Sequence, residues 1–403
     1  MKTTLCTLLA ALATAGCSPS NIDAVTTVAL GEAGVVPTTP MDASADARVK
    51  PTGAGLHTSG TQIVDKDGKP FVIRAVTWYG LDYDFYPHGL NALTIDDILS
   101  LMKKKGFNTI RLAWSSEMLH TTSKPQSINY TVNPDLVGVK TPRDLLDTVI
   151  VHAEALGLKI ILSRRRASAG SSPKLWWDGT YGPEKFVADW LDLAAQYRGR
   201  SSVIGCDLES DLRGETTWGD NNPNTDWKAA AEHAGSEILL HANADVLIFV
   251  EGIETVGTAS DWEGGNLQGV GTAPITLAVP NHLVYATQDF PVTFPDLPKQ
   301  GIPSWFSDPS YPMNLPQDVW DPYWGFVFEK GIAPVFIAGF GTAYMNPSDI
   351  LWLSQLTAYM KQNALGFAYY ALDEDAPGGL YLDYATSTLN EKLMTALGPI
   401  LTP

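Results

Sequence analysis

Hydrophobic and polar positions change their period repeatedly along most of the chain. In residues 94–105, apolar side chains recur every three to four positions between a Thr and a Gly, which predicts a capped amphipathic helix. Residues 107–114 follow directly and have the composition of a strand. The succession then recurs, with helices predicted over 142–156, 183–197, 227–241, 319–330 and 348–363, and strands over 71–78, 158–163, 203–207, 246–250, 282–286, 334–338 and 366–370.

These elements amount to eight strands that alternate with helices. Apolar strands joined through helices are typical of a parallel sheet that helices cover. Eight such units predict an α/β fold, a closed (β/α)8 TIM barrel, over residues 55–403. In that fold the chemistry lies where the strands end, on the loops that follow them.

The N-terminal residues have a different character. Residues 1–17 combine a short basic start with an apolar stretch that ends in small residues, which predicts an export signal. Residues 12–17 resemble a bacterial lipobox, in which Cys17 would be lipidated; simple secretion is the alternative, since Thr14 stands where that motif prefers Leu. Residues 18–54 are rich in Ala, Thr, Ser, Val and Pro without periodicity, which predicts a disordered tether. We expect an exported protein, secreted or anchored at the cell surface by lipid.

Composition narrows the class of partner. The 403 residues include 27 Lys and Arg against 44 Asp and Glu, a formal net charge of −17, which argues against a nucleic-acid partner. The three cysteines form no CxxC motif, and we expect neither a metal nor a cofactor. An acidic chain with 12 Trp suits a neutral partner such as a carbohydrate, bound by a monomer.

Aromatic side chains stand at several predicted strand ends and in the loops beside them. As a group they predict a carbohydrate cleft with aromatic platforms, although any single Trp could instead close the top of the barrel. The candidates for this role are Trp78, Trp114, Trp176, Trp177 and Trp218.

Several stretches resemble a known family. Residues 87–90 (PHGL), 106–112 (GFNTIRL), 247–252 (LIFVEG) and 264–269 (GGNLQG) are similar to bacterial endo-β-1,4-glucanases of glycoside hydrolase family 5. The similarity runs in register from about residue 55 to 384. It implies a TIM barrel that binds a β-glucan in its cleft and hydrolyses it with two carboxyl groups about 5–5.5 Å apart, one acting as nucleophile and one as acid/base.

The positions that this resemblance marks as catalytic have been replaced. Where the family has its nucleophilic Glu, this chain has Gly339, and its acid/base Glu is Asp211. Of the usual catalytic-centre set only Arg111 is unchanged. The further substrate-binding positions are occupied by Arg165, Ser210, Gln288, Phe290 and Tyr370.

These replacements leave three functions open. A glycine cannot form a covalent intermediate, and Asp211 is a methylene shorter than Glu, so we expect a catalytically inactive homologue with a polysaccharide-binding cleft. The first alternative is an active glycosidase that uses relocated carboxylates, with Asp373, Glu374 or Asp375 as candidates. The second is a cell-surface interaction module in which the cleft is unused.

Overall fold

The computed structural model describes residues 48–53, 55–171, 174–291, 294 and 314–402. The predicted export signal, including Cys17, and the predicted tether as far as residue 47 lie outside this part. Residues 49–53 are bound to the barrel: the Val49 N–H donates to the Leu240 carbonyl at 2.8 Å, and the Thr52 N–H to the Asp245 carboxylate at 2.9 Å. Residues 49–53, which the sequence assigned to the tether, therefore contact the barrel domain.

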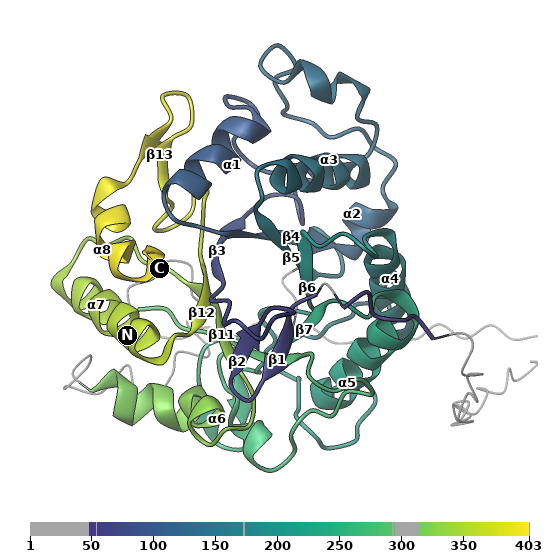
Figure 1. The fold of residues 1–403 in the computed structure, drawn as a ribbon, viewed down its shortest axis with the longest axis vertical. Coiled ribbons are helices and arrows are strands. Elements are labelled where there is room, and N and C mark those ends of the chain that lie inside the picture. The colour runs from purple at the N-terminus through teal and green to yellow at the C-terminus, as the bar shows by residue number, and fades with distance from the viewer. Residues whose placement is uncertain (1–47, 54, 172–173, 292–293, 295–313, 403) are drawn as a thin grey trace, which may run out of the picture. The chain divides into compact units, whose positions relative to one another are not determined.

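Eight parallel strands form a closed barrel, in the spatial order β10-β11-β12-β3-β4-β5-β6-β7 (Figure 1). They are β3 (Arg74–Trp78), β4 (Thr109–Ser115), β5 (Lys159–Arg166), β6 (Val203–Asp207), β7 (Leu247–Glu251), β10 (Leu283–Gln288), β11 (Val335–Phe340) and β12 (Gly366–Tyr369). Each corresponds to one of the eight predicted strands. The predicted (β/α)8 TIM barrel is confirmed.

Helices surround the barrel. They are α1 (Ile95–Lys104), α2 (Ser116–His120), α3 (Pro142–Ala155), α4 (Pro183–Gln196), α5 (Trp227–Glu237), α6 (Phe326–Glu329), α7 (Pro347–Asn363) and α8 (Glu391–Leu401). The short 3-10 helices are η2 (Pro134–Gly138) and η4 (Gln268–Gly271). Capping boxes at Thr94 and Thr141 start α1 and α3 where the sequence predicted.

Two predicted helices are irregular, and two helices, α2 and α8, were not predicted. The helix expected over 227–241 is α5 followed by a π-helical turn, η3 (Ile238–Ala242). The one expected over 319–330 is largely π-helical, η6 (Pro316–Gly325), with Pro322 inside it. Since proline has no N–H to donate, Pro322 prevents a regular α-helical hydrogen-bond ladder there. Helix α8 packs on α7 near the C-terminus.

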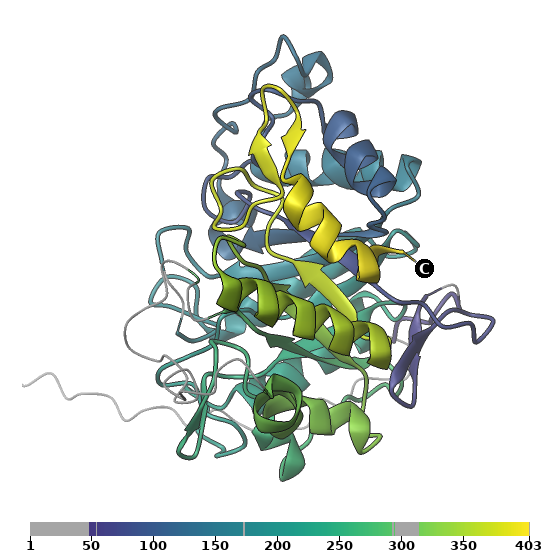
Figure 2. The ribbon, with the colours of Figure 1, turned by 90° about the vertical axis from the view of Figure 1, so that its left-hand side faces the viewer.

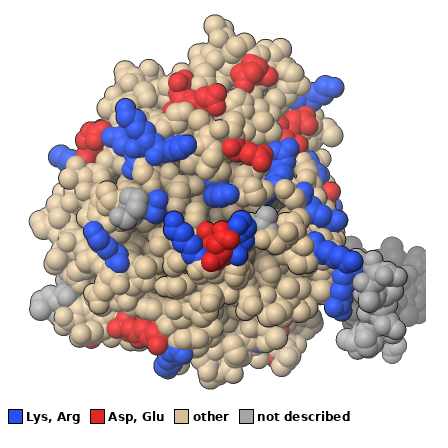
Figure 3. Space-filling view, viewed as in Figure 1, with Lys and Arg blue, Asp and Glu red and all other residues tan. Residues whose placement is uncertain are grey.

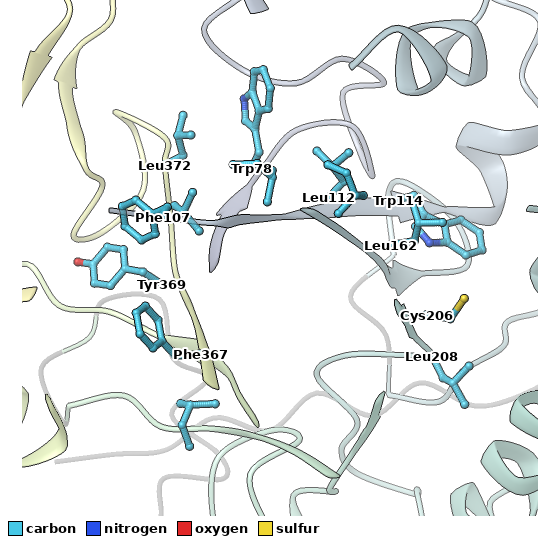
Figure 4. Packing of buried hydrophobic residues seen from close by; sticks show 14 of the residues in the cluster. Trp78, Phe107, Leu112, Trp114, Leu162, Cys206, Leu208, Phe367, Tyr369 and Leu372 are labelled. Carbon is cyan, nitrogen blue, oxygen red and sulfur yellow. The ribbon is translucent and has the colours of Figure 1, made fainter. Parts of the chain in front are cut away.

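Strand side chains divide between two apolar cores. Residues such as Ile161, Phe249 and Phe336 point into the barrel, while Leu112, Leu162 and their like point out against the helices. Figure 4 shows the outward set, which includes Trp78, Trp114 and Cys206.

The hairpin of β1 (His57–Ser59) and β2 (Gln62–Val64) covers the N-terminal end of the barrel, where Leu56 and Ile63 join the interior core. Figure 2 shows this hairpin at one end of the barrel. Two further small pairs complete the strands: β8 (Thr255–Val256) with β9 (Ala259–Ser260), and β13 (Tyr381–Asp383) with β14 (Thr388–Leu389). Among the described residues, no helix combines the length and the apolar character that crossing a bilayer requires.

Candidate active site

Polar side chains gather inside the barrel at the C-terminal ends of its strands. Strand residues two apart share a face, so the inward direction of the core residues continues to these positions. On β5, Ile161 points into the barrel, so Arg165, four residues later, does so too. On β7, Phe249 points inwards, and so does Glu251, two residues later. The set formed in this way is Arg111, Arg165, Asp207, Glu251 and Gln288. The barrel therefore brings residues from five strands to one site.

Arg111 is the centre of a buried network. Its Nε donates to the Asp207 carboxylate at 2.8 Å, and its Nη2 donates to Ser210 Oγ at 2.8 Å and to Glu251 Oε1 at 3.1 Å. All four residues are essentially inaccessible to solvent. A buried guanidinium needs such partners, because an unpaired buried charge is very costly. Arg111 and Ser210, both predicted for the site, therefore lie beneath its surface and hold it together.

Asp211 is held from two sides. One carboxylate oxygen forms an ion pair with Arg165, and the other accepts a hydrogen bond from Gln288 Nε2 at 2.7 Å. Its backbone N–H donates to Glu251 Oε2 at 3.2 Å, and its φ of 62° is in the left-handed region that few non-glycine residues adopt. The carboxylate is therefore fixed within the site.

The ion pair also sets the charge of Asp211. Burial by itself raises the pKa of a carboxyl group, but the Arg165 guanidinium and the Gln288 amide outweigh it, so the Asp211 pKa is below its ordinary value. For Glu251, burial and the nearby Asp207 carboxylate raise the pKa well above the usual range. The site thus holds Asp211, whose pKa is lowered and whose ionised form is favoured, beside Glu251, whose ionisation is opposed by burial and by the Asp207 carboxylate.

Gly339 lies next to Gln288, and the amide takes up the space of the absent side chain. A Cβ at position 339 would come within 2.7 Å of Gln288 Oε1. The two residues are partners in the β10–β11 register, at a point where that register shifts. Gln288 Nε2 is bound to both Asp211 and Glu251 Oε2, the latter at 3.1 Å. The predicted nucleophile position is therefore occupied by a tethered neutral amide.

A row of aromatic rings crosses the site, but tryptophan is not its main component. Tyr370, after β12, lies 5.8 Å from Tyr79 and 6.2 Å from Phe290, measured between ring centroids. Tyr79 continues to Tyr83 at 4.8 Å, and Phe290 to Phe294 at 4.5 Å. The Arg165 guanidinium lies 5.4 Å from the Tyr370 ring centroid. Phe290 and Tyr370, both predicted for the site, are part of this row.

Three of the five predicted tryptophan platforms are wrong. Trp78 and Trp114 are fully buried because both occupy outward positions on their strands, and Trp114 packs edge-on against Trp190 at 4.8 Å. Trp176 is 1% exposed and lies beside Trp227. None of these three rings has a face that a sugar can reach.

The other two predicted platforms, Trp177 and Trp218, are partly exposed. Each donates its indole N–H to a backbone carbonyl: Trp177 to Asn224 at 3.1 Å and Trp218 to Ala273 at 2.8 Å. Their rings are therefore oriented by the loops that carry them.

The three acidic residues of the eighth loop are used elsewhere. Asp373 is buried and forms an ion pair with His88. The Glu374 carboxylate accepts the Tyr384 N–H at 2.6 Å, and Asp375 is exposed. Asp211 has Arg165, Gln288 and Glu251 as its described neighbours instead.

Sequence reasoning did not include Asp207, Glu251 or Tyr79 among the site residues. The alternation along β7 was the available signal for Glu251, whereas on β6 the register shifts at Ile204 and interrupts the alternation before Asp207. Nothing comparable marks Tyr79, which lies just beyond the end of β3. Among the described residues, no group of three His, Cys, Asp or Glu side chains is arranged to hold a metal ion.

The sequence matches a known family and its members. Residues 64–376 match the family described as Cellulase (glycosyl hydrolase family 5). An endoglucanase of Paenibacillus polymyxa is 39% identical over 355 residues, which cover 86% of this chain and 87% of that protein. The major extracellular endoglucanase of Xanthomonas campestris pv. campestris is 31% identical over 343 residues, covering 82% and 68%.

Solved structures show the same architecture. The complex of a Pyrococcus horikoshii endocellulase variant with cellotetraose has a TM-score of 0.79 at 27% identity, over 88% of this chain and all of that one. The catalytic domain of the Xanthomonas endoglucanase has a TM-score of 0.78 at 29% identity, over 86% and 99%.

Proposed function

Because the chain belongs to the cellulase family, glycosyl hydrolase family 5, we propose that it is a member that binds a β-glucan-like polysaccharide without hydrolysing it. The observation that carries this proposal is which residues stand, in this chain, at the two positions where the family has its catalytic carboxyl groups. Gly339 has no side chain, and Gln288 takes its space. Asp211 is short and is bound by Arg165.

The retaining reaction needs a carboxylate that attacks the sugar and a carboxylic acid that protonates the departing oxygen. At Gly339 the first group is absent, and the neutral Gln288 amide is a far weaker nucleophile than a carboxylate. At Asp211 the pKa is lowered, so at neutral pH the group carries no proton to give. The site therefore lacks both the nucleophilic carboxylate and the proton-donating carboxylic acid that the retaining reaction needs.

The described contacts also disfavour a relocated carboxylate pair. Glu251 is close to Asp211, but its oxygens are bound by Arg111, Gln288 and the Asp211 N–H. A Cβ on Gly264 would lie 2.3 Å from Glu251 Oε2, so that loop also covers the carboxyl group. Asp373 and Glu374 are engaged by His88 and by the Tyr384 backbone.

Binding is supported by the aromatic row and by the relatives. Tyr79, Tyr83, Phe294 and Tyr370 are partly exposed. Each aromatic contact contributes on the order of 1 kcal/mol, so three or four together support roughly millimolar binding of an oligosaccharide. The relatives named above are endoglucanases, and one solved neighbour is complexed with cellotetraose.

Hydrolysis is tested on carboxymethylcellulose and an aryl cellobioside, with the Paenibacillus polymyxa endoglucanase as positive control. We expect no reducing sugar above background. Turnover at ordinary enzyme rates, roughly 1–10³ per second, would contradict the proposal. If activity were found, Glu374→Gln and Asp373→Asn variants would show whether the eighth loop supplies it.

Binding is tested by calorimetric titration with cellotetraose. We expect Tyr79→Ala and Tyr370→Ala each to weaken it about 5-fold, as one lost ring contact predicts. Tyr130→Ala, in the loop before η2, is the matched control and should bind as the wild type does. Absence of heat and of any melting shift with cellotetraose, mannan or uronic-acid oligomers would leave the interaction-module alternative.

Export with lipid attachment at Cys17 is part of the same proposal. It rests on residues 1–17 alone. Metabolic labelling with a radioactive fatty acid should mark the wild type, and Cys17→Ser should remove the label. Release of an unlabelled wild-type protein into the medium would indicate simple secretion.

A further inference from the structure

The two ends of the barrel differ in charge. In a parallel barrel, helix starts lie at the end where the strands finish, and helix ends lie at the opposite end. Acidic residues occupy first helical turns, as at Asp96, Asp97 and Asp144, whereas α1 ends on Lys103 and Lys104. The chain as a whole has a net charge of −17, so basic residues gathered at one end stand against an acidic background.

We define the basic face as the exposed or partly exposed cations at the N-terminal end of the barrel. Figure 3 looks onto this end and shows Lys and Arg side chains around a central acidic group, with further Asp and Glu side chains towards the upper and lower edges of the view. The members that carry the argument are Lys66, Lys69, Lys103, Lys104, Arg198 and Arg200.

Helix dipoles explain only part of this face. A cation in a last helical turn is favourable because it lies near unpaired carbonyls, and Lys103 donates to the Leu156 carbonyl at 2.6 Å in this way. Lys66 and Lys69 are different, because they lie in the turn after β2, away from any helix end, and are exposed. A helix dipole therefore does not explain the cations at these two positions.

The four acidic residues named next also lie at this end and keep their negative charge, but they are fewer than the six cations of the face. Asp245 accepts the Thr52 N–H, Glu154 pairs with Arg200 at 3.0 Å, and Asp65 accepts the Lys69 N–H at 2.9 Å. Asp67 pairs with Lys66 in an exposed contact at 2.7 Å, which contributes little and is easily exchanged. Lys69 and Lys104 have no ion-pair partner within the described part of the chain.

The described chain also begins at this end. Arg48 and Lys50 are exposed and flank Val49, which is bound to the Leu240 carbonyl at the end of η3. Arg48 and Lys50 therefore add two cations to this end of the barrel.

We propose that the basic face docks on an anionic phospholipid bilayer. Lys and Arg near an anionic membrane attract it with about 1 kcal/mol each, an interaction that salt screens within a Debye length. In this orientation the strand ends that carry Asp211 and the aromatic row point away from the lipid. The inference stands independently of glycan binding and of lipid attachment at Cys17.

Co-sedimentation of the full chain with vesicles tests the proposal. Cys17→Ser is included in every sample, so that no covalent lipid contributes. We expect binding to vesicles that contain phosphatidylglycerol at low salt, and its loss in about 1 M NaCl, where the Debye length is about 3 Å. Vesicles of phosphatidylcholine alone measure any contribution from the apolar N-terminal residues.

Matched variants locate the surface. Lys66→Gln, Lys69→Gln and Lys104→Gln combined should lower the partition coefficient on the order of 100-fold, about 5-fold per residue. The control combines Lys124→Gln, Lys174→Gln and Lys185→Gln, which remove equal charge at the other end of the barrel and should change nothing. Asp67→Asn should strengthen binding, because it removes an acidic charge from the middle of the face.

Three results would overturn the proposal: equal binding to neutral and anionic vesicles, an equal loss in the control variant, or no binding at low salt. Binding to dextran sulfate without binding to phosphatidylglycerol vesicles would do the same, and would indicate a soluble polyanion as the partner. Melting temperatures of all variants, measured alongside, exclude unfolding as the cause of a loss.

Discussion

The Gln288 amide and the Arg165 guanidinium compensate for two changes at their neighbours. Gln288 fills the space beside Gly339, and Arg165 neutralises the Asp211 carboxylate. An empty space or an unpaired buried charge would each be costly, whereas the observed combination is packed and paired. The replacements are therefore mutually adapted, and reversing any one of them alone should disturb the others.

The contact between Gly339 and Gln288 gives the first prediction. Gly339→Ala should destabilise the protein by about 1–3 kcal/mol, because its Cβ would lie 2.7 Å from Gln288 Oε1. In a Gln288→Ala background, which has its own cost because the hydrogen bonds to Asp211 and Glu251 are lost, Gly339→Ala should add little further destabilisation. Gly179→Ala is the control, since a Cβ there meets nothing within 4 Å. Equal effects at Gly339 and Gly179 in urea unfolding would show that Gln288 does not fill the position.

The ion pair gives the second prediction. Arg165→Met should destabilise the protein by about 3–5 kcal/mol at pH 7, because it leaves Asp211 as an uncompensated buried charge. The Asp211 pKa is lowered in the folded state, so its contribution is present above about pH 4 and is lost as the pH falls through the lowered value. The melting-temperature gap to wild type should therefore narrow towards pH 3.

Arg165→Met with Asp211→Asn is the matched control, because it removes both charges and should recover much of the stability. A gap that stays constant from pH 7 to pH 3 would mean that Arg165 acts by packing rather than by charge.

At the scale of elements, the sequence predicted correctly those helices that carry a local sequence signal at their start. Helices α1 and α3 carry capping boxes, and their predicted starts agree with the structure. The π-helical segment η6 has the apolar spacing of an ordinary α-helix. Pro322 is its one sequence feature that argues against regular α-helical hydrogen bonds. The loops after β3 and β12 have no periodicity at all, so their contact through His88 and Asp373 was beyond sequence reasoning.

That contact gives the third prediction. Burial lowers the His88 pKa, but hydrogen bonds to Asp373 and Asp84 outweigh it and raise the pKa to about 9. A raised folded pKa means stability that is fully present below about pH 6.5 and is lost as the pH rises through 9. His88→Asn should thus melt below wild type at pH 6, by an amount equivalent to about 2–3 kcal/mol, and approach it near pH 10.

His233→Asn, on the exposed side of α5, is the control for this experiment and should follow the wild type at every pH. A His88→Asn deficit that is as large at pH 10 as at pH 6 would contradict the proposed charge of His88.

At the scale of the molecule, the eight-fold alternation was sufficient for the fold, and strand parity was sufficient for part of the site. Arg111, Arg165 and Gln288 lie inside the barrel as their strand positions require, and the same parity sends Trp78 and Trp114 outwards. The prediction of Trp78 and Trp114 as sugar-binding platforms was wrong because it ignored which face of the strand each residue occupies. The row through Tyr79, Tyr370 and Phe290 arises from loops whose approach depends on the closed barrel, and no local pattern encodes it.

The chain has the family's scaffold, and under the proposed function hydrolysis is limited by the residues at the two catalytic positions and not by the barrel. The TM-score of 0.79 at 27% identity shows that backbone positions are retained over 88% of the chain. Restoring the family's residues together should therefore recover hydrolysis. The substitutions are Arg165→His, Ser210→Asn, Asp211→Glu, Gln288→His, Phe290→Tyr and Gly339→Glu.

We expect the six-fold variant to hydrolyse an aryl cellobioside at least about 10³-fold above wild type, because catalytic groups that act as a unit fail and recover together. Gly339→Glu alone should restore little, since Gln288 occupies its space and Asp211 stays paired with Arg165. The other five changes with Gly339 left in place form the control and should remain inactive. A folded six-fold variant with no turnover would show that the backbone around β6 and β11 has itself moved away from a catalytic geometry.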